Sequence, residues 1–466
     1  MSPMDLLLTH GYFLEADPQE RRIMKPYPPL GLLYVSSHLK SRGFRVGVFD
    51  STFRSFGELA SLLRRERPPV VGIYCNLMTK ASVLRIAAEC RRAGALVVLG
   101  GPEPPYHAGE YLERGADIVV VGEGERALEE LLPRLLARRD DRELADVAGL
   151  VYRAADGGVV RTPPRPLIPD LDAQPLPDRE AIDLGAYLVA WRRHHGTGSI
   201  SLLTARGCPY TCRWCSRSVF GESHRRRSVE AVADEVALLA ERYRPDMLWY
   251  VDDVFTIHKG WTLRYAAELE RRRLRIPFEC ISRAERIDED VAEALASLGC
   301  FRLWIGSESG SQRILDAMDR RVQVEQVRHA TRLLKQRGIQ VGMFIMLGYE
   351  GEEASDLAAT VSHLKQADPD VFLTTVSYPI KGTPYYDDVA GRIRQAGAWE
   401  AGTDRDLVIR GRHTPLYYRF ARQWMSGEVA RHRHWRDRRY VAAARAATSA
   451  SVGRLGMALL ERRRVR

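Results

Sequence analysis

Three cysteines lie close together in the stretch Gly207-Cys208-Pro209-Tyr210-Thr211-Cys212-Arg213-Trp214-Cys215. A tetrahedral zinc site takes four ligands, whereas this stretch offers three and has no histidine beside them. Three thiolates can hold an iron–sulfur cubane and leave its fourth iron open to another ligand. The Cys-x3-Cys-x2-Cys spacing therefore predicts a [4Fe–4S] cluster on Cys208, Cys212 and Cys215, in preference to three core cysteines.

The cysteines follow the first of six predicted strands. Ser199–Thr204 is a buried apolar run that leads directly into the cysteine loop. The other five predicted strands are Met247–Val251, Phe278–Ser282, Phe301–Ile305, Gln340–Met346 and Val371–Ser377. Amphipathic segments of helical period separate them: Ser228–Arg242, Trp261–Arg273, Asp288–Ser297, Val324–Arg337 and Glu353–Gln366. This alternation predicts a parallel sheet with right-handed crossovers, which binds its ligands at the carboxyl ends of its strands.

Polar or glycine-rich residues follow four of these strands, at the edge where ligands are expected. They are Asp252 and Asp253, Arg283, Glu308, and the run Leu347-Gly348-Tyr349-Glu350-Gly351-Glu352. A single acidic or basic residue at a strand end is often only a helix cap or half of an ion pair. Together the four positions predict one binding site.

The cysteine run, including Trp214 before its last cysteine, resembles the signature of the radical S-adenosylmethionine (radical SAM) family. The six strand–helix units match the partial (βα)6 barrel of that family. The resemblance implies that SAM chelates the free iron and is cleaved to a 5'-deoxyadenosyl radical. It also implies that Glu308 and Arg283 bind the amine and carboxylate of SAM. Trp214, Leu347 and Gly348 would line the adenine, and Asp252 and Asp253 would touch SAM or substrate.

Residues 1–150 have a different strand and helix pattern. Short buried runs at Asp5–His10, Arg45–Asp50, Val70–Tyr74, Leu96–Leu99 and Ile118–Val121 alternate with helical segments at Leu30–Arg42, Phe56–Arg65, Ala81–Arg92 and after Tyr106. Such units predict a doubly wound, flavodoxin-like α/β domain with a crevice at its carboxyl edge. Glycines of two loops fall at that edge and are expected to bind a cofactor: Gly100, Gly101, Gly122 and Gly124.

This first domain resembles the cobalamin (B12)-binding domain that precedes many radical SAM enzymes. The run Pro28-Pro29-Leu30-Gly31-Leu32-Leu33-Tyr34 and Gly100-Gly101-Pro102 are typical of that fusion. Domains that offer cobalamin a lower axial ligand carry Asp-x-His-x-x-Gly after the second strand. Here that place reads Asp50-Ser51-Thr52-Phe53-Arg54-Ser55, without a histidine. The resemblance therefore leaves open whether cobalamin is bound.

Composition is consistent with two domains and a tail. We expect a B12-binding-type domain at 1–150, a proline-rich linker at 151–195, a radical SAM core at 196–395 and an arginine-rich helical region at 396–466. Cys75, Cys90, Cys280 and Cys300 lie in apolar segments and are expected in the core. No signal peptide or membrane-length apolar run is evident, and an oxygen-sensitive cluster argues for the cytoplasm.

The net charge of +10 does not by itself indicate a nucleic-acid partner, because arginine is used throughout and no RNA-binding module is present. The basic segments near the end predict a solvated helix face. Their alternative interpretation is a docking patch for an acidic redox partner or an anionic substrate. A flavodoxin- or ferredoxin-type electron donor is expected.

Two departures from the family pattern bear on the reaction. Glu350 and Lys381 stand where this fusion usually has proline, on loops at the carboxyl end of the barrel. With Asp253 they are candidates for proton transfer to and from a small polar substrate. The favoured hypothesis is dehydration of a sugar diol, similar to the radical SAM diol dehydratases of aminoglycoside (antibiotic) biosynthesis acting on paromamine, with an NAD(P)H-dependent reductase completing deoxygenation. The alternatives are a cobalamin-dependent C-methyltransferase and a non-catalytic iron–sulfur or B12 sensor.

Overall fold

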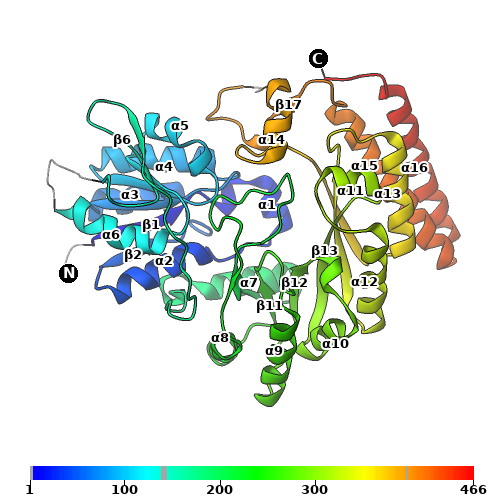
Figure 1. Ribbon diagram of the computed structural model, residues 1–466, viewed down its shortest axis with the longest axis horizontal. Coiled ribbons are helices and arrows are strands. Elements are labelled where there is room, and N and C mark those ends of the chain that lie inside the picture. The colour runs from blue at the N-terminus through cyan, green and yellow to red at the C-terminus, as the bar shows by residue number, and fades with distance from the viewer. Residues whose placement is uncertain (1–3, 138–143, 395–396, 466) are drawn as a thin grey trace. The chain divides into compact units, whose positions relative to one another are not determined.

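The computed structural model describes residues 4–137, 144–394 and 397–465 (Figure 1). Contacts divide these residues into two compact units. The first lies within Met1–Pro209, Ser216–Val251 and Gly397–Thr403, and the second within Tyr210–Cys215, Asp252–Ala396 and Asp404–Arg466. The cysteine loop is therefore shared between the units, because Cys208 belongs to the first and the other two cysteines to the second.

A seven-stranded sheet forms the centre of the first unit, in the order β2-β1-β3-β4-β5-β6-β7. Five strands are parallel: β1 Leu6–His10, β2 Val46–Phe49, β3 Val70–Tyr74, β4 Leu96–Gly100 and β5 Ile118–Val120. The helices are α1 Pro18–Ile23, α2 Leu30–Ser41, α3 Phe56–Glu66, α4 Lys80–Arg92, α5 Ala108–Glu113 and α6 Gly124–Leu136. Apolar clusters cover both faces of the sheet, and the 2-1-3-4-5 order confirms the predicted flavodoxin-like fold.

The sheet of the first unit extends beyond residue 150. Strands β6 Leu150–Arg153 and β7 Val159–Arg161 add to it in antiparallel fashion. The segment predicted as a linker therefore contains β7 and most of β6, and it ends in helix α7 Leu184–His195. Alternating short strands carry too weak a pattern to be separated from a linker by sequence alone.

The cysteine loop is preceded by β8 Ser199–Leu202 in the first unit. β8 pairs in parallel with β11 Met247–Tyr250 across helix α8 Val229–Arg242, which Ser228 caps. A short antiparallel pair, β9 Ala205–Arg206 with β10 Arg225–Arg226, closes the base of the loop. Both flanks of the cysteine loop are thus tied to the first unit.

The second unit contains the other four predicted strands. Its parallel strands are ordered β15-β14-β13-β12, with bounds β12 Phe278–Ser282, β13 Cys300–Glu308, β14 Gln340–Leu347 and β15 Val371–Val376. Its helices are α9 Lys259–Arg271, α10 Glu289–Leu298, α11 Gln312–Ala317, α12 Val324–Gln336, α13 Ala354–Ala367 and α14 Pro384–Val389. All six predicted strands are present, and a helix follows each one but the last before the next strand begins.

A helical hairpin completes the second unit. The small antiparallel pair β16 Ile393–Arg394 and β17 Val408–Ile409 precedes α15 Pro415–Arg436 and α16 Tyr440–Leu460, which lie side by side (Figure 1, orange to red). The predicted helical C-terminal region is confirmed. No helix in the described parts of the chain is long and apolar enough to cross a membrane.

Candidate active site

Four contacts hold residues 210–215 of the cysteine loop inside the second unit. The Thr211 hydroxyl donates to Asp319, and the Arg213 guanidinium pairs with Asp388 at 2.7 Å. The Arg213 amide donates to the Met318 carbonyl, while its own carbonyl accepts from the amide of Tyr385. The loop is therefore positioned by the turn after α11 on one side and by α14 on the other.

Cys212 has the surroundings of a thiolate ligand. Its sulfur lies 3.4 Å from Nη1 of Arg283 and 3.9 Å from Nη1 of Arg320. A hydrogen bond from Cys215 and the positive charge of Arg283 lower the pKa of the Cys212 thiol to about 7, although burial opposes them. Because the thiolate is the form that binds iron, these side chains fit the predicted cluster.

The third cysteine, Cys208, is partly buried in the first unit. In the described residues no group of three or more histidine, cysteine, aspartate or glutamate side chains has the arrangement of a metal site. The fit to the cluster therefore rests on the pair Cys212 and Cys215 and on the two arginines beside Cys212.

Glu308 lies at the end of β13 and is brought close to Cys212 and Arg283, as predicted. A register shift after Gly306 and a φ of +60° at Glu308 aim its side chain inward. A Cβ at Gly306 would lie 2.7 Å from the Arg320 guanidinium and 2.8 Å from the Glu308 carboxylate, so glycine is needed there. Burial, followed by the Cys212 charge, raises the pKa of Glu308 to about 8. A buried carboxylate that lacks a full counter-charge suits the ammonium of SAM.

Glu308→Gln should weaken SAM binding about 10- to 100-fold while the cluster still assembles. The expected loss is that of a charge-assisted hydrogen bond, about 1.5–3 kcal/mol. Isothermal titration of the reconstituted protein with SAM, together with iron analysis, measures both effects. Glu350→Gln, whose carboxylate lies on a half-exposed loop, is the control; unchanged affinity in Glu308→Gln would remove Glu308 from the SAM site.

The predicted adenine-lining residues lie at the end of β14. Trp214 packs against a buried cluster that includes Met346 and Tyr349, and Leu347 is fully buried. Gly348 has a φ of +69°, and a Cβ there would meet Arg412 and Tyr418 at 2.6 Å. The Gly348 turn is therefore closed by residues of the C-terminal region, a contact that the sequence did not predict.

Glu352 and Ser377 bind the two backbone polar groups of Gly348. The Gly348 amide donates to Oε2 of Glu352 at 2.5 Å, and the Ser377 hydroxyl donates to the Gly348 carbonyl at 2.8 Å. Arg412 in turn donates to the Ser377 hydroxyl at 2.9 Å. Burial raises the pKa of Glu352 to about 8, and its Oε1 has no hydrogen-bond partner.

The stability of the second unit should fall as pH rises from about 4.5 to about 8, in part through Glu352. In that window the folded chain keeps the proton of Glu352, which the unfolded chain releases, so deprotonation favours unfolding. Glu352→Gln should flatten this part of the profile because an amide does not titrate. Melting temperatures of the wild type and of Glu352→Gln at about pH 5, 7 and 8.5 measure how stability changes with pH. Equal slopes would exclude Glu352 as the cause.

Two of the predicted proton-transfer residues have other roles in the structure. Glu350 is half-exposed and pairs with Arg392 at 2.8 Å. Lys381 is partly buried, and its backbone amide donates to Asp404 at 3.0 Å. Glu350 is therefore one half of an ion pair on the loop surface, and its role and that of Lys381 in catalysis stay predictions.

The acidic pair after β11 is split between two environments. Asp252 is fully buried, whereas water reaches the side chain of Asp253. Surrounding protein and the neighbouring Asp252 charge raise the pKa of Asp253. The predicted contact of Asp253 with SAM or substrate stays a prediction.

The sequence analysis missed Arg320. Its side chain is buried between Cys212 and the Gly306 carbonyl, to which Nη2 donates at 2.7 Å. It lies between Asp319 and Arg321, both of which have φ near +50°. The charged run Asp319-Arg320-Arg321 directly after a short helix was the only sequence signal, and it resembles an ordinary solvated turn.

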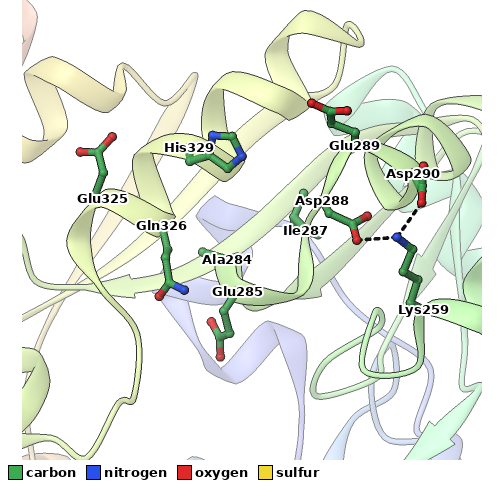
Figure 2. A pocket seen from close by; sticks show the side chains of 10 residues that line it. All are labelled: Lys259, Ala284, Glu285, Ile287, Asp288, Glu289, Asp290, Glu325, Gln326 and His329. Carbon is green, nitrogen blue, oxygen red and sulfur yellow. Dashed lines mark hydrogen bonds and ion pairs between the residues drawn. The ribbon is translucent and has the colours of Figure 1, made fainter.

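An acid-rich cavity of about 590 Å³ opens beside Arg283 in the second unit. Figure 2 shows Lys259 paired with Asp288 and Asp290 on one side of it and Glu285 on another. Glu285 also accepts a hydrogen bond from Nε of Arg283. None of the acidic residues Asp252, Asp253, Glu350 and Glu352, which follow β11 and β14, lines this cavity.

Two glycine loops lie at the sheet edge of the first unit, one with Gly100 and Gly101 and the other with Gly122 and Gly124. Gly101 has a φ of +107°, and a Cβ there would lie 2.3 Å from the Cys75 carbonyl, while Gly100 faces open space. Gly122 also has positive φ, and Gly124 begins α6. Gly100 therefore leaves space for a ligand, whereas Gly101 is needed for close packing against Cys75, and cofactor binding by these loops stays a prediction.

The carboxylates of the second glycine loop bind the base of the cysteine loop. Arg206 donates to Glu123 and to Glu125, both at 2.7 Å, and all three side chains are buried. Glu123 also accepts from Arg225 at 2.8 Å. This loop thus anchors the segment that leads into Cys208.

The loop after β2 contains Asp50, which bonds to two residues of the first unit. Asp50 accepts from His10 at 2.9 Å and from the Tyr187 hydroxyl at 2.8 Å. The other ring nitrogen of His10 accepts the Tyr12 amide. His10, the nearest histidine, therefore has both nitrogens engaged within the protein.

Comparisons with known proteins agree with both halves of this arrangement. The Radical SAM superfamily model matches residues 202–364, and the B12 binding domain model matches residues 22–132. The radical SAM methyltransferase TsrM from Kitasatospora setae, solved with cobalamin and a [4Fe–4S] cluster, aligns with a TM-score of 0.71. It is 23% identical, over 86% of this chain and 81% of its own, and so supports the fold.

Two sequence relatives cover most of the chain. An uncharacterized methyltransferase of Pyrococcus horikoshii is 30% identical over 83% of this chain and 84% of its own length. An anaerobic magnesium-protoporphyrin IX monomethyl ester cyclase of Rubrivivax gelatinosus is 28% identical over 74% and 63%. Radical SAM proteins use a [4Fe–4S] cluster and SAM, and the B12-binding domain supports cobalamin as a third cofactor. The chain belongs to the radical SAM superfamily, in the group whose members carry a B12-binding domain ahead of the radical SAM domain.

Proposed function

We propose that this protein is a cobalamin-dependent radical SAM methyltransferase. The observation that carries the proposal is the 30% identity, over 83% of this chain, to a relative that bears the methyltransferase name, together with the B12 binding domain matched at residues 22–132. We favour it over dehydration, because the relative from Pyrococcus horikoshii and the solved protein TsrM are both named as methyltransferases. The methyltransferase was the alternative in the sequence analysis.

When bound, the cluster and SAM supply reductive cleavage of SAM, and cobalamin supplies a methyl carrier. The chain's own residues bind and orient these groups. Cys208, Cys212 and Cys215 would hold the cluster, with Arg283 and Arg320 stabilising the Cys212 thiolate. Glu308 would bind the amine of SAM, and the Gly348 turn would support its adenine.

Cobalamin would lie at the open edge of the first sheet. Gly100 leaves space for a ligand there, and the loop after β2 offers no histidine to its lower face. We therefore expect the first unit to hold cobalamin without using a histidine. The absorption spectrum of the bound cofactor, and its insensitivity to His10→Ala, would test this.

The function is tested with anaerobically reconstituted protein and SAM carrying a labelled methyl group, against candidate small polar substrates. The proposal expects product that gains one labelled methylene and a reaction that stops when cobalamin is omitted. Loss of oxygen from the product without any need for cobalamin would replace methyl transfer by dehydration. A new ring without label would favour a cyclase reaction.

A further inference from the structure

The charge of this chain is concentrated at its end. Residues 431–466 contain eleven arginines and two acidic residues, so they carry +9 of the net charge of +10. Helix α16 itself has no acidic residue between Tyr440 and Leu460. The rest of the chain is therefore almost neutral, and the basic character of the protein comes from the end of α15, from α16 and from the residues after it.

Several of these arginines have no acidic partner in the described part of the chain. Arg433 and Arg436 pair with Asp368 of the second unit. Arg445, Arg454 and Arg462 have no such pairing. Free guanidinium groups on both flanks of a helix create a positive field for an anionic partner.

One face of α16 is packed and the other is apolar yet open to water. Gly453 and Gly456 lie directly against α15, where a Cβ would approach Trp424 and Phe420 within 2.5 Å. The opposite face carries the exposed apolar stripe Val441, Val452, Leu455 and Leu459, with Arg445 and Thr448 at the intervening helical positions. Leu459 is 72% exposed, Val441 71% and Leu455 63%, and the first two are the most exposed large apolar side chains in the described chain. A helix that is apolar on both faces requires a second apolar surface.

Aromatic side chains stand at the amino end of this stripe. Trp435 and Tyr440 pack edge to face, with ring centroids 5.4 Å apart, and both are largely exposed. Tryptophan and tyrosine favour the boundary between lipid and water, because each has an apolar ring and a polar group.

We propose that α16 and the end of α15 bind the surface of a membrane rich in anionic lipid. The apolar stripe would enter the acyl boundary, and Arg445, Arg438 and Arg462 would face lipid phosphates. A second copy is disfavoured as occupant because the strongly positive hairpin would meet itself. An acidic redox protein would use the arginines, but its contact does not call for a row of leucine and valine together with interfacial aromatic residues.

The test is flotation of the full-length, cluster-reconstituted protein with vesicles. Vesicles of phosphatidylcholine alone are compared with vesicles of phosphatidylcholine and phosphatidylglycerol in equal amounts. We expect binding only to the anionic vesicles, weakening as salt is added. Leu455→Glu/Leu459→Glu should lower the affinity at least about tenfold, since it removes two inserted side chains. Val189→Glu is the matched control, because Val189 on α7 is also 63% exposed and should leave binding unchanged.

Iron content and SAM cleavage should be equal in all these proteins, which shows that the variants are folded. Failure to bind anionic vesicles, or equal binding by the stripe variant, would overturn the proposal. So would light scattering that shows a dimer lost in Leu455→Glu/Leu459→Glu, since the stripe would then belong to a second copy. If Leu455→Glu/Leu459→Glu slowed electron transfer from a flavodoxin but left vesicle binding unchanged, the surface would instead bind an acidic protein.

Discussion

Cys212→Ala should abolish cluster assembly and SAM cleavage together. Two remaining thiolates cannot hold the three irons that the cysteines must ligate, so the effect is complete loss rather than a graded one. Cys208→Ala and Cys215→Ala should behave in the same way. Iron and sulfide analysis after anaerobic reconstitution, with chromatography of SAM and its products, measures both properties.

Cys300→Ser is the matched control for the cysteine variants. Cys300 is buried in β13, and its thiol donates to the Arg302 carbonyl, a bond that a serine hydroxyl can keep. It should retain the iron content of the wild type. Normal SAM cleavage by any of the three loop variants would contradict the assignment of the cluster to this loop.

Arg206→Met should destabilise the first unit by about 3–5 kcal/mol, the cost of leaving a buried charge without its partner. Glu125 would lose the guanidinium at 2.7 Å, while Glu123 would keep Arg225. Because Arg206 directly precedes the cysteine loop, iron retention should fall as well. Urea unfolding followed by circular dichroism measures the loss of stability.

Two further variants separate this effect from general damage. Arg206→Met/Glu125→Gln removes the stranded charge and should recover part of the lost stability. Arg64→Met breaks an exposed pair with Glu89 and should cost less than about 1 kcal/mol. If the double variant were no more stable than Arg206→Met, the loss would come from packing rather than from the unpaired carboxylate.

Both sheets could be predicted because their signals are local. Buried runs such as Val70–Tyr74 and Phe278–Ser282 are strands with the same bounds in the structure. Their alternation with amphipathic helical segments predicts a parallel sheet. The hairpin strands β6 and β7 escaped prediction because each is short, and β7 is largely exposed.

The residues of the candidate site also include some that could be predicted from the sequence and some contacts that could not. Cys212 was predicted from the cysteine spacing, and Arg283 and Glu308 were predicted because strand ends can be located from sequence. The ion pair of Glu350 could not be predicted, because its partner, Arg392, is 42 positions away in the chain. A residue type at a loop position predicts a charge but not the counter-charge that will neutralise it.

The sequence by itself indicated the iron–sulfur and SAM chemistry, because three cysteines at this spacing can ligate three irons of a cubane, and it indicated the order of strands and helices; it left cobalamin open. Only the tertiary structure decided how that chemistry is supported. Arg206 meets Glu123 and Glu125 across more than 80 positions, and Arg320 reaches Cys212 across 108. No periodicity records such pairs, since an ion pair is selected by which charges the folded chain buries together.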